Sequence, residues 1–236
     1  MIPATAHAMG GDVTRLSYDG EPMPTLSEAD SKQLLATHGV PVLEERTVTN
    51  ADEAAQAAKK LGFPLVAKLC GAAIAHKTER GLVRLALEDE RAVRTATDEL
   101  LAAARPEDGD VAVLLAPMVS GTRELIAGLA DDPTFGRTVM LGIGGILAEA
   151  VSDVTFRLVP ITAADAEDMI DDLATQRVFG SFRGEPAIDR TKLVHVLVGL
   201  SDAAVARPEI ASADVNPMIV VDGAPVAVDA LVEVYQ

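Results

Sequence analysis

The 236-residue sequence has no tryptophan, one cysteine and an aromatic content of only 3%. A single cysteine, Cys70, excludes an internal disulfide and is typical of a reducing compartment. So few aromatic side chains argue against a surface that stacks single-stranded bases. Positive charge is also scarce, because 20 Lys and Arg face 36 Asp and Glu, for a net charge of −16. This balance argues against a broad nucleic-acid surface.

Long apolar runs are absent as well. No run is long enough to span a bilayer, and residues 1–11 lack the basic region and continuous apolar stretch of a signal peptide. We therefore expect a cytoplasmic protein with no membrane partner. What the sequence does have is a hydrophobic content of 49%, which is enough for a sizeable core in one large domain or two lobes.

The order of patterns along the chain predicts two lobes. Residues 1–24 show no periodic apolar pattern and carry several Gly and Pro, so we predict a flexible N-terminal extension. A polar break at 105–110 predicts a boundary between an N-terminal lobe, 25–107, and a C-terminal lobe, 108–236. Strands and helices alternate irregularly, which favours the α+β class over a doubly wound parallel sheet.

Local patterns predict the individual elements. Capping residues and apolar periodicity predict helices at 27–39, 51–61, 89–104, 163–174 and 189–206. Short apolar or alternating runs predict strands at 42–48, 64–69, 83–87, 111–115, 124–129 and 139–141, and a hairpin of 219–221 with 226–234 around an Asp-Gly turn.

One lysine interrupts an apolar strand. Lys68 lies within the run 64–69, where a buried ammonium costs free energy unless it is paired or lies at the edge of a site. It is therefore a candidate phosphate-binding cation. The alternative is a lysine on an edge strand whose ammonium reaches water along its aliphatic stem.

Two further stretches suit phosphate chemistry. His76 and Lys77 follow a run of small residues. A neutral imidazole can attack phosphorus, and a neighbouring ammonium can hold the phosphoryl oxygens. Glycines at 142, 144 and 145 follow a strand and would let backbone N–H groups approach an anion. Taken singly, the pair is more typical of a solvated loop, and the glycines of an ordinary turn.

Hard oxygen ligands gather near the end of the chain. Asp214 and Asn216 alternate along an extended segment, so their side chains point to one side of it. Asp229 lies in the predicted strand 226–234, which the Asp-Gly turn would bring alongside. Carboxylate and amide oxygens arranged in this way suit Mg²⁺. The alternative is an Asn-Pro turn beside an edge-strand aspartate.

In this order, the motifs closely resemble the ATP-grasp domain of NDP-forming acyl-CoA synthetases, which is the beta subunit in the ADP-forming acetyl-CoA synthetases. The resemblance runs from about Leu26 to Val234 and rests on the segments 62–68, 76–81, 132–136, 140–146, 179–184, 214–217 and 227–230. It implies an ATP-grasp fold, in which two α+β lobes hold ATP or ADP between them.

The resemblance also implies a role for each candidate residue. His76 and Lys77 would be catalytic, with His76 as a relay for the phosphoryl group. The nucleotide would contact Lys68 through its phosphates and, elsewhere in its pocket, the residues Ala116, Met118, Glu124, Gly144 and Gly145. Mg²⁺ would be bound by Asp214, Asn216 and Asp229.

The implied activity is reversible synthesis of acyl-CoA from a carboxylate, CoA and ATP, with release of ADP and phosphate. The chain would be the ATP-binding beta-type subunit. Its partner would be a CoA-binding alpha subunit or domain with its own phosphorylated histidine, in an α2β2 or fused arrangement. Two alternatives are a non-catalytic nucleotide-sensing module of an acyltransferase-type or regulatory assembly, and a ligase of the succinate or malate type, whose beta subunits are usually longer.

Three places depart from the family pattern. Residues 116–117 are Ala-Pro where Gln-Glu is usual, and the proline offers no N–H to adenine. Leu82 stands where a second glycine is usual, and 72–73 are Ala-Ala in place of a common Pro-Asp. Because the candidate histidine, the lysine at 68 and the metal-type residues remain, we expect a divergent branch and not an inactive one.

Overall fold

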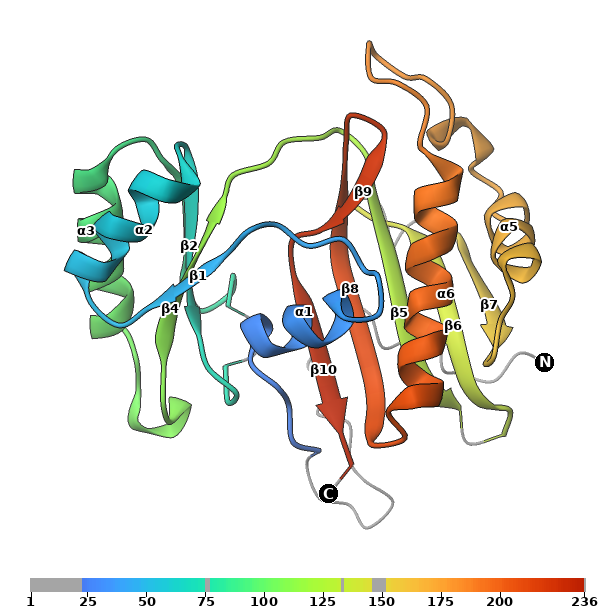
Figure 1. The fold of residues 1–236 in the computed structure, drawn as a ribbon, viewed down its shortest axis with the longest axis horizontal. Helices are drawn as coiled ribbons and strands as arrows, with labels where there is room; N and C mark the ends of the chain where they lie inside the picture. Colours follow the sequence, from blue (N-terminus) through green and yellow to red (C-terminus); the bar gives the residue numbers. More distant parts are fainter. Residues whose placement is uncertain (1–22, 75–76, 133, 146–151, 236) are drawn as a thin grey trace.

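The computed structural model describes residues 23–74, 77–132, 134–145 and 152–235. Figure 1 shows a smaller lobe on the left and a larger lobe on the right. Each lobe combines helices with an antiparallel sheet, which confirms the predicted α+β class. No helix within these ranges is long and apolar enough to cross a membrane.

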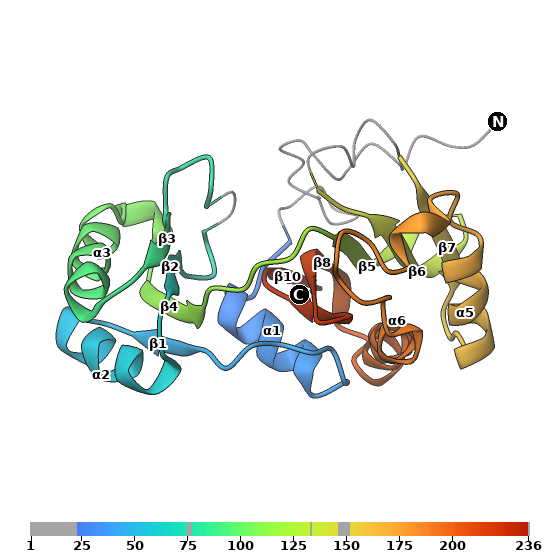
Figure 2. The ribbon, with the colours of Figure 1, turned by 90° about the horizontal axis from the view of Figure 1, so that it is seen from above.

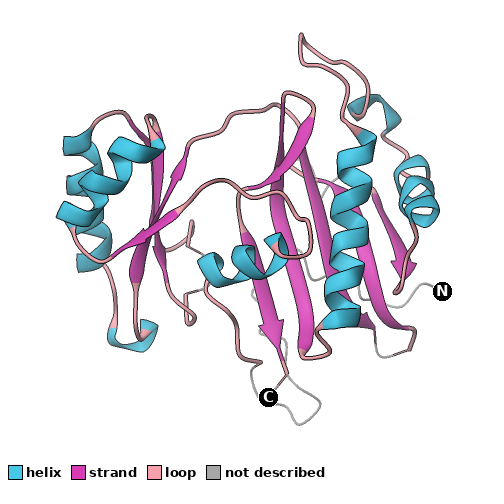
Figure 3. Ribbon diagram, viewed as in Figure 1, coloured by secondary structure: helices cyan, strands magenta, loops and turns pink. Residues whose placement is uncertain are grey.

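The small lobe is built on a four-stranded sheet in the order β1-β4-β2-β3. Its strands are β1 (Arg46–Val48), β2 (Leu65–Cys70), β3 (Val83–Leu87) and β4 (Ala112–Pro117). Helices α2 (Ala51–Leu61) and α3 (Glu90–Ala102) pack on one face of this sheet, and Figure 3 shows them on the side away from the large lobe. The other face of the sheet is therefore turned toward the large lobe.

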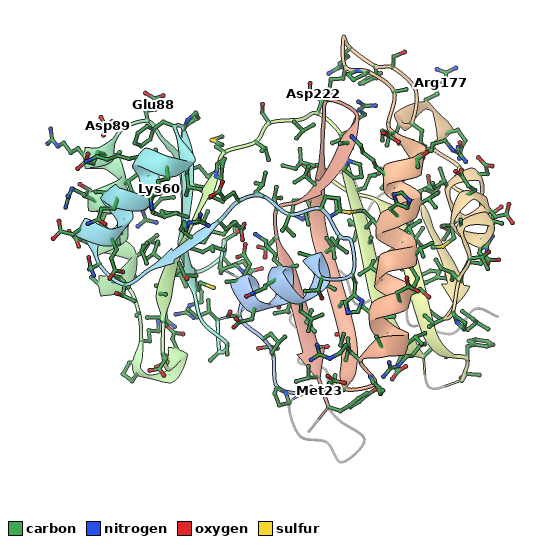
Figure 4. All side chains as sticks on the ribbon, in the orientation of Figure 1. Met23, Lys60, Glu88, Asp89, Arg177 and Asp222 are labelled. Atoms are coloured by element: carbon green, nitrogen blue, oxygen red, sulfur yellow. The ribbon has the colours of Figure 1, made fainter. Side chains whose placement is uncertain are left out.

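The large lobe is built on a six-stranded sheet in the order β10-β8-β5-β6-β7, with β9 paired to β8. Its strands are β5 (Glu124–Asp132), β6 (Gly136–Ile143), β7 (Val154–Leu158), β8 (Ile210–Val221), β9 (Ala224–Ala227) and β10 (Ala230–Val234). Helices α1 (Glu28–Ala36), α5 (Ala163–Asp171) and α6 (Arg190–Ala206) cover one face of it (Figure 2). The β8–β9 hairpin, with Asp222 at its tip, points to the opposite end of the lobe from Met23 (Figure 4).

Side-chain caps and buried apolar faces explain the helices. The Asn50 side chain accepts the backbone N–H groups of Asp52 and Glu53 at the start of α2, which satisfies donors that the helix itself cannot pair. In α6, Leu193 and Leu197 are fully buried at helical spacing, so this helix lies along the centre of the large core.

Most predicted elements are present at their predicted places, and α2 and β3 match to the residue. The predicted position of Asp229 inside a strand is wrong. β8 pairs first with β9 and then with β10, and Asp229 lies in the break between these two strands. At this break Asn216 N–H donates to Asp229 O at 3.3 Å and Val228 N–H donates to Pro217 O at 3.1 Å.

The predicted lobe ranges, 25–107 and 108–236, stay a prediction. β4 follows residue 107 but is hydrogen-bonded between β1 and β2 of the small sheet. α1 belongs to the first range in sequence but packs its Leu35 into the core of the large lobe. Of the predicted extension 1–24, only the last two residues are described, and Pro24 O accepts the N–H of Val234 at 2.9 Å.

Candidate functional site

Two lysines of the small lobe meet two carboxylates at the junction of the lobes. Lys68 is on β2 and Lys77 lies in the segment between β2 and β3. Glu28 is the first residue of α1, and Asp229 lies between β9 and β10, so both carboxylates come from elements of the large lobe. The sequence separations are large, and only the fold brings these groups together.

Lys68 points away from the core of the small lobe. In β2 the alternate residues Leu65, Ala67 and Leu69 are fully buried beneath the helices, so Lys68 projects from the other face. Its Nζ donates to Glu28 Oε1 at 2.6 Å and to Val228 O at 2.8 Å. Because β2 is a central strand and the ammonium is paired, the alternative of a solvated edge-strand lysine is wrong.

Lys77 lies beside the same carboxylates. Its Nζ is 2.7 Å from Glu28 Oε2 and 3.3 Å from Asp229 Oδ1. Burial acts to lower the pKa of Lys77, but the carboxylates of Asp229 and Glu28 outweigh it, so the pKa is raised. The side chain is therefore a fixed cation, as a ligand for phosphoryl oxygens must be.

Glu28 is the buried centre of this cluster and is not among the residues predicted from the sequence. Its side chain is 1% exposed, and it also accepts a hydrogen bond from Lys32 at 2.7 Å. Burial acts to raise the pKa of Glu28, but the three surrounding ammoniums, that of Lys68 foremost, lower it to about 2. The only signal in the sequence is a Glu and a Lys four residues apart, which is typical of an ordinary helix surface.

The predicted metal residues lie on β8 and the break opposite it. Asn216 and Asp229 are joined by a backbone hydrogen bond, and Asp214 lies two residues before Asn216 on β8. Asp229 is 30% exposed, and its oxygens are 3.3 and 3.5 Å from the two ammoniums. Among the described residues, no group of three or more His, Cys, Asp or Glu side chains could hold a metal ion. Metal binding here, with Asn216 as one ligand, stays a prediction.

Three of the predicted nucleotide-binding residues lie together. Gly144 N–H donates to Glu124 O at 2.8 Å. A Cβ at Gly144 would lie 3.1 Å from the carbonyl carbon of Glu124, so any larger residue would have to push this backbone aside by a few tenths of an ångström. Gly145 has a φ of +88°, and the carboxylate of Glu124 lies close beside it. The turn after β6 and the start of β5 therefore form one surface.

The predicted hinge residues lie where the chain crosses between the lobes (Figure 1). Ala116 is buried in β4 opposite Val66. Met118 is partly exposed, and its N–H donates to Pro64 O at 2.9 Å. Since Pro117 has no N–H and that of Met118 is occupied, neither residue offers a free backbone donor to a nucleotide base.

His76 lies outside the described residues, but the segment that follows it is firmly held. Arg80 donates two hydrogen bonds to Asp108, at 2.7 and 2.9 Å. These hydrogen bonds, together with one from the backbone N–H of Arg105, lower the pKa of Asp108 to about 2. Leu82 is buried in the small core and its N–H donates to Lys77 O at 2.8 Å. Leu82 thus fills space that glycine would leave empty.

The profile of the ATP-grasp domain matches residues 20–234. The chain belongs to the ATP-grasp family. Within this family it is 34% identical to the beta subunit of acetate–CoA ligase [ADP-forming] I of Pyrococcus furiosus, over 87% of this chain and 90% of that protein. It is also 36% identical to the 4-hydroxybutyrate–CoA ligase [ADP-forming] of Nitrosopumilus maritimus. That match covers 86% of this chain but only 29% of the other protein.

A solved ATP-grasp relative has the same fold. It is the dinucleotide-forming acetyl-coenzyme A synthetase 1 of Ca. Korarchaeum cryptofilum, in complex with coenzyme A and Mg-AMPPCP, with its phosphohistidine segment pointing towards the nucleotide binding site. The TM-score is 0.78 at 32% identity, over 92% of this chain and 95% of that one. The ATP-grasp fold predicted from the sequence is therefore confirmed.

Proposed function

We propose that the chain is the nucleotide-binding beta-type subunit of an ADP-forming acyl-CoA synthetase. The reaction is a carboxylate, CoA and ATP giving acyl-CoA, ADP and phosphate, and it is reversible. The observation that carries this proposal is the pair of ammoniums, Lys68 and Lys77, held side by side between the lobes. Similarity over nearly the full length of the Pyrococcus beta subunit supports it.

The described residues supply positioning and charge. Lys68 and Lys77 bind the phosphate oxygens, while Glu124 and the adjoining glycine turn line the pocket. Asp229 and Asn216, with Asp214 beside them, offer hard oxygen ligands that fit Mg²⁺. When bound, Mg²⁺ would neutralise phosphate charge during transfer.

His76 is the proposed relay for the phosphoryl group. In the direction of ATP synthesis, an imidazole nitrogen of His76 forms a P–N bond as the P–N bond of the partner's phosphohistidine breaks. A terminal phosphate oxygen of ADP then forms a P–O bond as the P–N bond at His76 breaks, and neutral imidazole is regenerated. Each transfer exchanges one bond to phosphorus for another. The phosphoryl group is therefore passed on without being lost to water, and its transfer free energy is conserved.

The proposed partner is a CoA-binding alpha subunit, or an equivalent fused domain, that carries the other phosphohistidine. The Korarchaeum relative, whose phosphohistidine segment points towards the nucleotide site, supports this arrangement. The Nitrosopumilus relative is much longer than this chain, which is compatible with fusion of the two parts in some proteins. An α2β2 stoichiometry is proposed on the family resemblance alone.

Titration of the full chain with Mg-ATP tests the nucleotide site. We expect Lys68→Met to weaken Mg-ATP binding about 100-fold, because it removes a partly buried, charge-assisted contact worth roughly 2–3 kcal/mol. Lys192→Met changes an exposed lysine on α6 and should leave the affinity unchanged. If Lys68→Met binds Mg-ATP as tightly as the unaltered chain, the nucleotide is not bound at this site.

A further inference from the structure

The cluster at the lobe junction contains two kinds of carboxylate. Glu28 is 1% exposed and lies 2.6 Å from the ammonium of Lys68 and 2.7 Å from that of Lys77. Asp229 is 30% exposed and lies 3.5 and 3.3 Å from the same two ammoniums. By distance Glu28 is therefore the closer ion-pair partner of both lysines, although Lys77 also donates a hydrogen bond to Asp229 Oδ1.

The Glu28 carboxylate is also bound by a third lysine, from its own helix. Lys32, one helical turn further along α1, donates to Glu28 Oε1 at 2.7 Å and to Glu45 Oε1 at 2.6 Å. The Lys32 side chain is 2% exposed, so this anchor is buried with the carboxylate. The pairing fixes the Glu28 side chain in one place, because breaking it would leave a buried charge without compensation.

We propose that Glu28 is a positioning residue for phosphate binding. It holds the ammoniums of Lys68 and Lys77 side by side, and it stays bound to them while a nucleotide phosphate takes the place of Asp229. Lys32 acts through Glu28 by keeping the carboxylate in position. This inference rests on the proposed function, in which the two lysines bind nucleotide phosphates.

The charge balance of the cluster allows positioning by Glu28 to be distinguished from an effect of net charge. Three ammoniums face three carboxylates, namely Glu28, Glu45 and Asp229. Neutralising Glu28 or Asp229 therefore changes the net charge by the same amount beside the same two lysines. Net charge alone predicts tighter anion binding in both cases.

Positioning by Glu28 predicts opposite results for the two changes. Without the Asp229 carboxylate, the phosphate meets no competitor for the ammoniums, and binding tightens. Without the Glu28 carboxylate, Lys68 and Lys77 keep Asp229 as their shared carboxylate partner. Both ammoniums then turn toward it, so an incoming phosphate must break stronger ion pairs, and binding weakens.

The test is calorimetric titration of the full chain with ADP in the presence of EDTA, so that no divalent cation contributes. We expect Glu28→Gln to weaken ADP binding about tenfold and Asp229→Asn to tighten it about threefold. Glu28→Asp, which keeps the charge but withdraws the carboxylate by one methylene, should also weaken it several-fold. If Glu28→Gln does not fold, the ADP affinity of Glu28→Asp tests the positioning role in its place.

Glu167→Gln is the matched control, since it removes a carboxylate of α5 that pairs with Arg190 at the start of α6. It should leave ADP affinity unchanged. Tighter binding by both Glu28→Gln and Asp229→Asn would show that net charge alone acts, and would overturn the proposal. Unchanged affinity in Glu28→Gln and Glu28→Asp would overturn it as well. If the unaltered chain binds neither ADP here nor Mg-ATP in the titration described above, the proposed function itself fails, and the inference with it.

Discussion

At the scale of single residues, an unusual local pattern was sufficient to select one residue of the lobe-junction cluster. A lysine inside an apolar strand is uncommon enough that Lys68 could be selected from the sequence, and its ammonium does lie in the ion-pair cluster at the junction of the lobes. Glu28 could not be selected, because nothing in its neighbourhood differs from a solvated first helical turn. Its burial depends on Lys68, 40 positions further along the chain, and on the packing of α1 against the large lobe.

The Arg80–Asp108 pair gives a prediction with a defined pH range. The pKa of Asp108 is lowered to about 2 by the hydrogen bonds from Arg80, so the folded state favours the ionised carboxyl. The stability that this gives is complete above the unfolded pKa, near 4, and is lost as the pH falls through about 2. We expect Asp108→Asn to be less stable than the unaltered chain at pH 7, and the difference to shrink from pH 4 downward.

Urea unfolding at a series of pH values measures this difference. Glu107→Gln serves as the control, because it changes the exposed neighbour of Asp108. The Glu107 carboxylate comes no closer than 3.9 Å to Arg105 and so forms only a loose ion pair. A difference between Asp108→Asn and the unaltered chain that stays constant down to pH 3 would show that the ion pair does not titrate as described.

At the scale of elements, most helices and strands could be predicted, because caps and periodicity are local. α2 has its Asn cap and apolar stripe within eleven residues, and it forms where predicted. Asp229 was placed wrongly for a non-local reason. β8 is twelve residues long and exchanges partners along its length, and no feature of 224–234 by itself marks the break.

Leu82 provides the prediction at this scale. Its side chain is 2% exposed in the core of the small lobe, at a position where the family resemblance implies glycine. Leu82→Ala should lower the free energy of unfolding by about 3 kcal/mol, because it leaves a cavity in a packed core. Leu85→Ala, at a site 61% exposed on β3, should change stability by less than about 0.5 kcal/mol. Equal losses in the two variants, measured by urea unfolding, would contradict this packing.

At the scale of the whole molecule, the ordered series of motifs predicted the ATP-grasp fold, and the lobes and relatives confirm it. What the sequence could not show is how the lobes share the site. Lys68 and Lys77 come from the small lobe, whereas Glu28 and Asp229 come from the large one. Nucleotide binding and the contact between lobes are therefore expected to be coupled through the same ion pairs.

The central claim is that the phosphoryl group passes through His76. The direct test uses the chain in complex with its CoA-binding partner. This complex is incubated with Mg²⁺ and with ATP that carries ³²P in the γ-phosphate, and the acid-labile ³²P on the protein is then mapped to a peptide. We expect label on the peptide that contains His76. Replacement of His76 by Asn should abolish both this label and the synthesis of acyl-CoA. Undiminished acyl-CoA synthesis by the His76→Asn complex would contradict the relay.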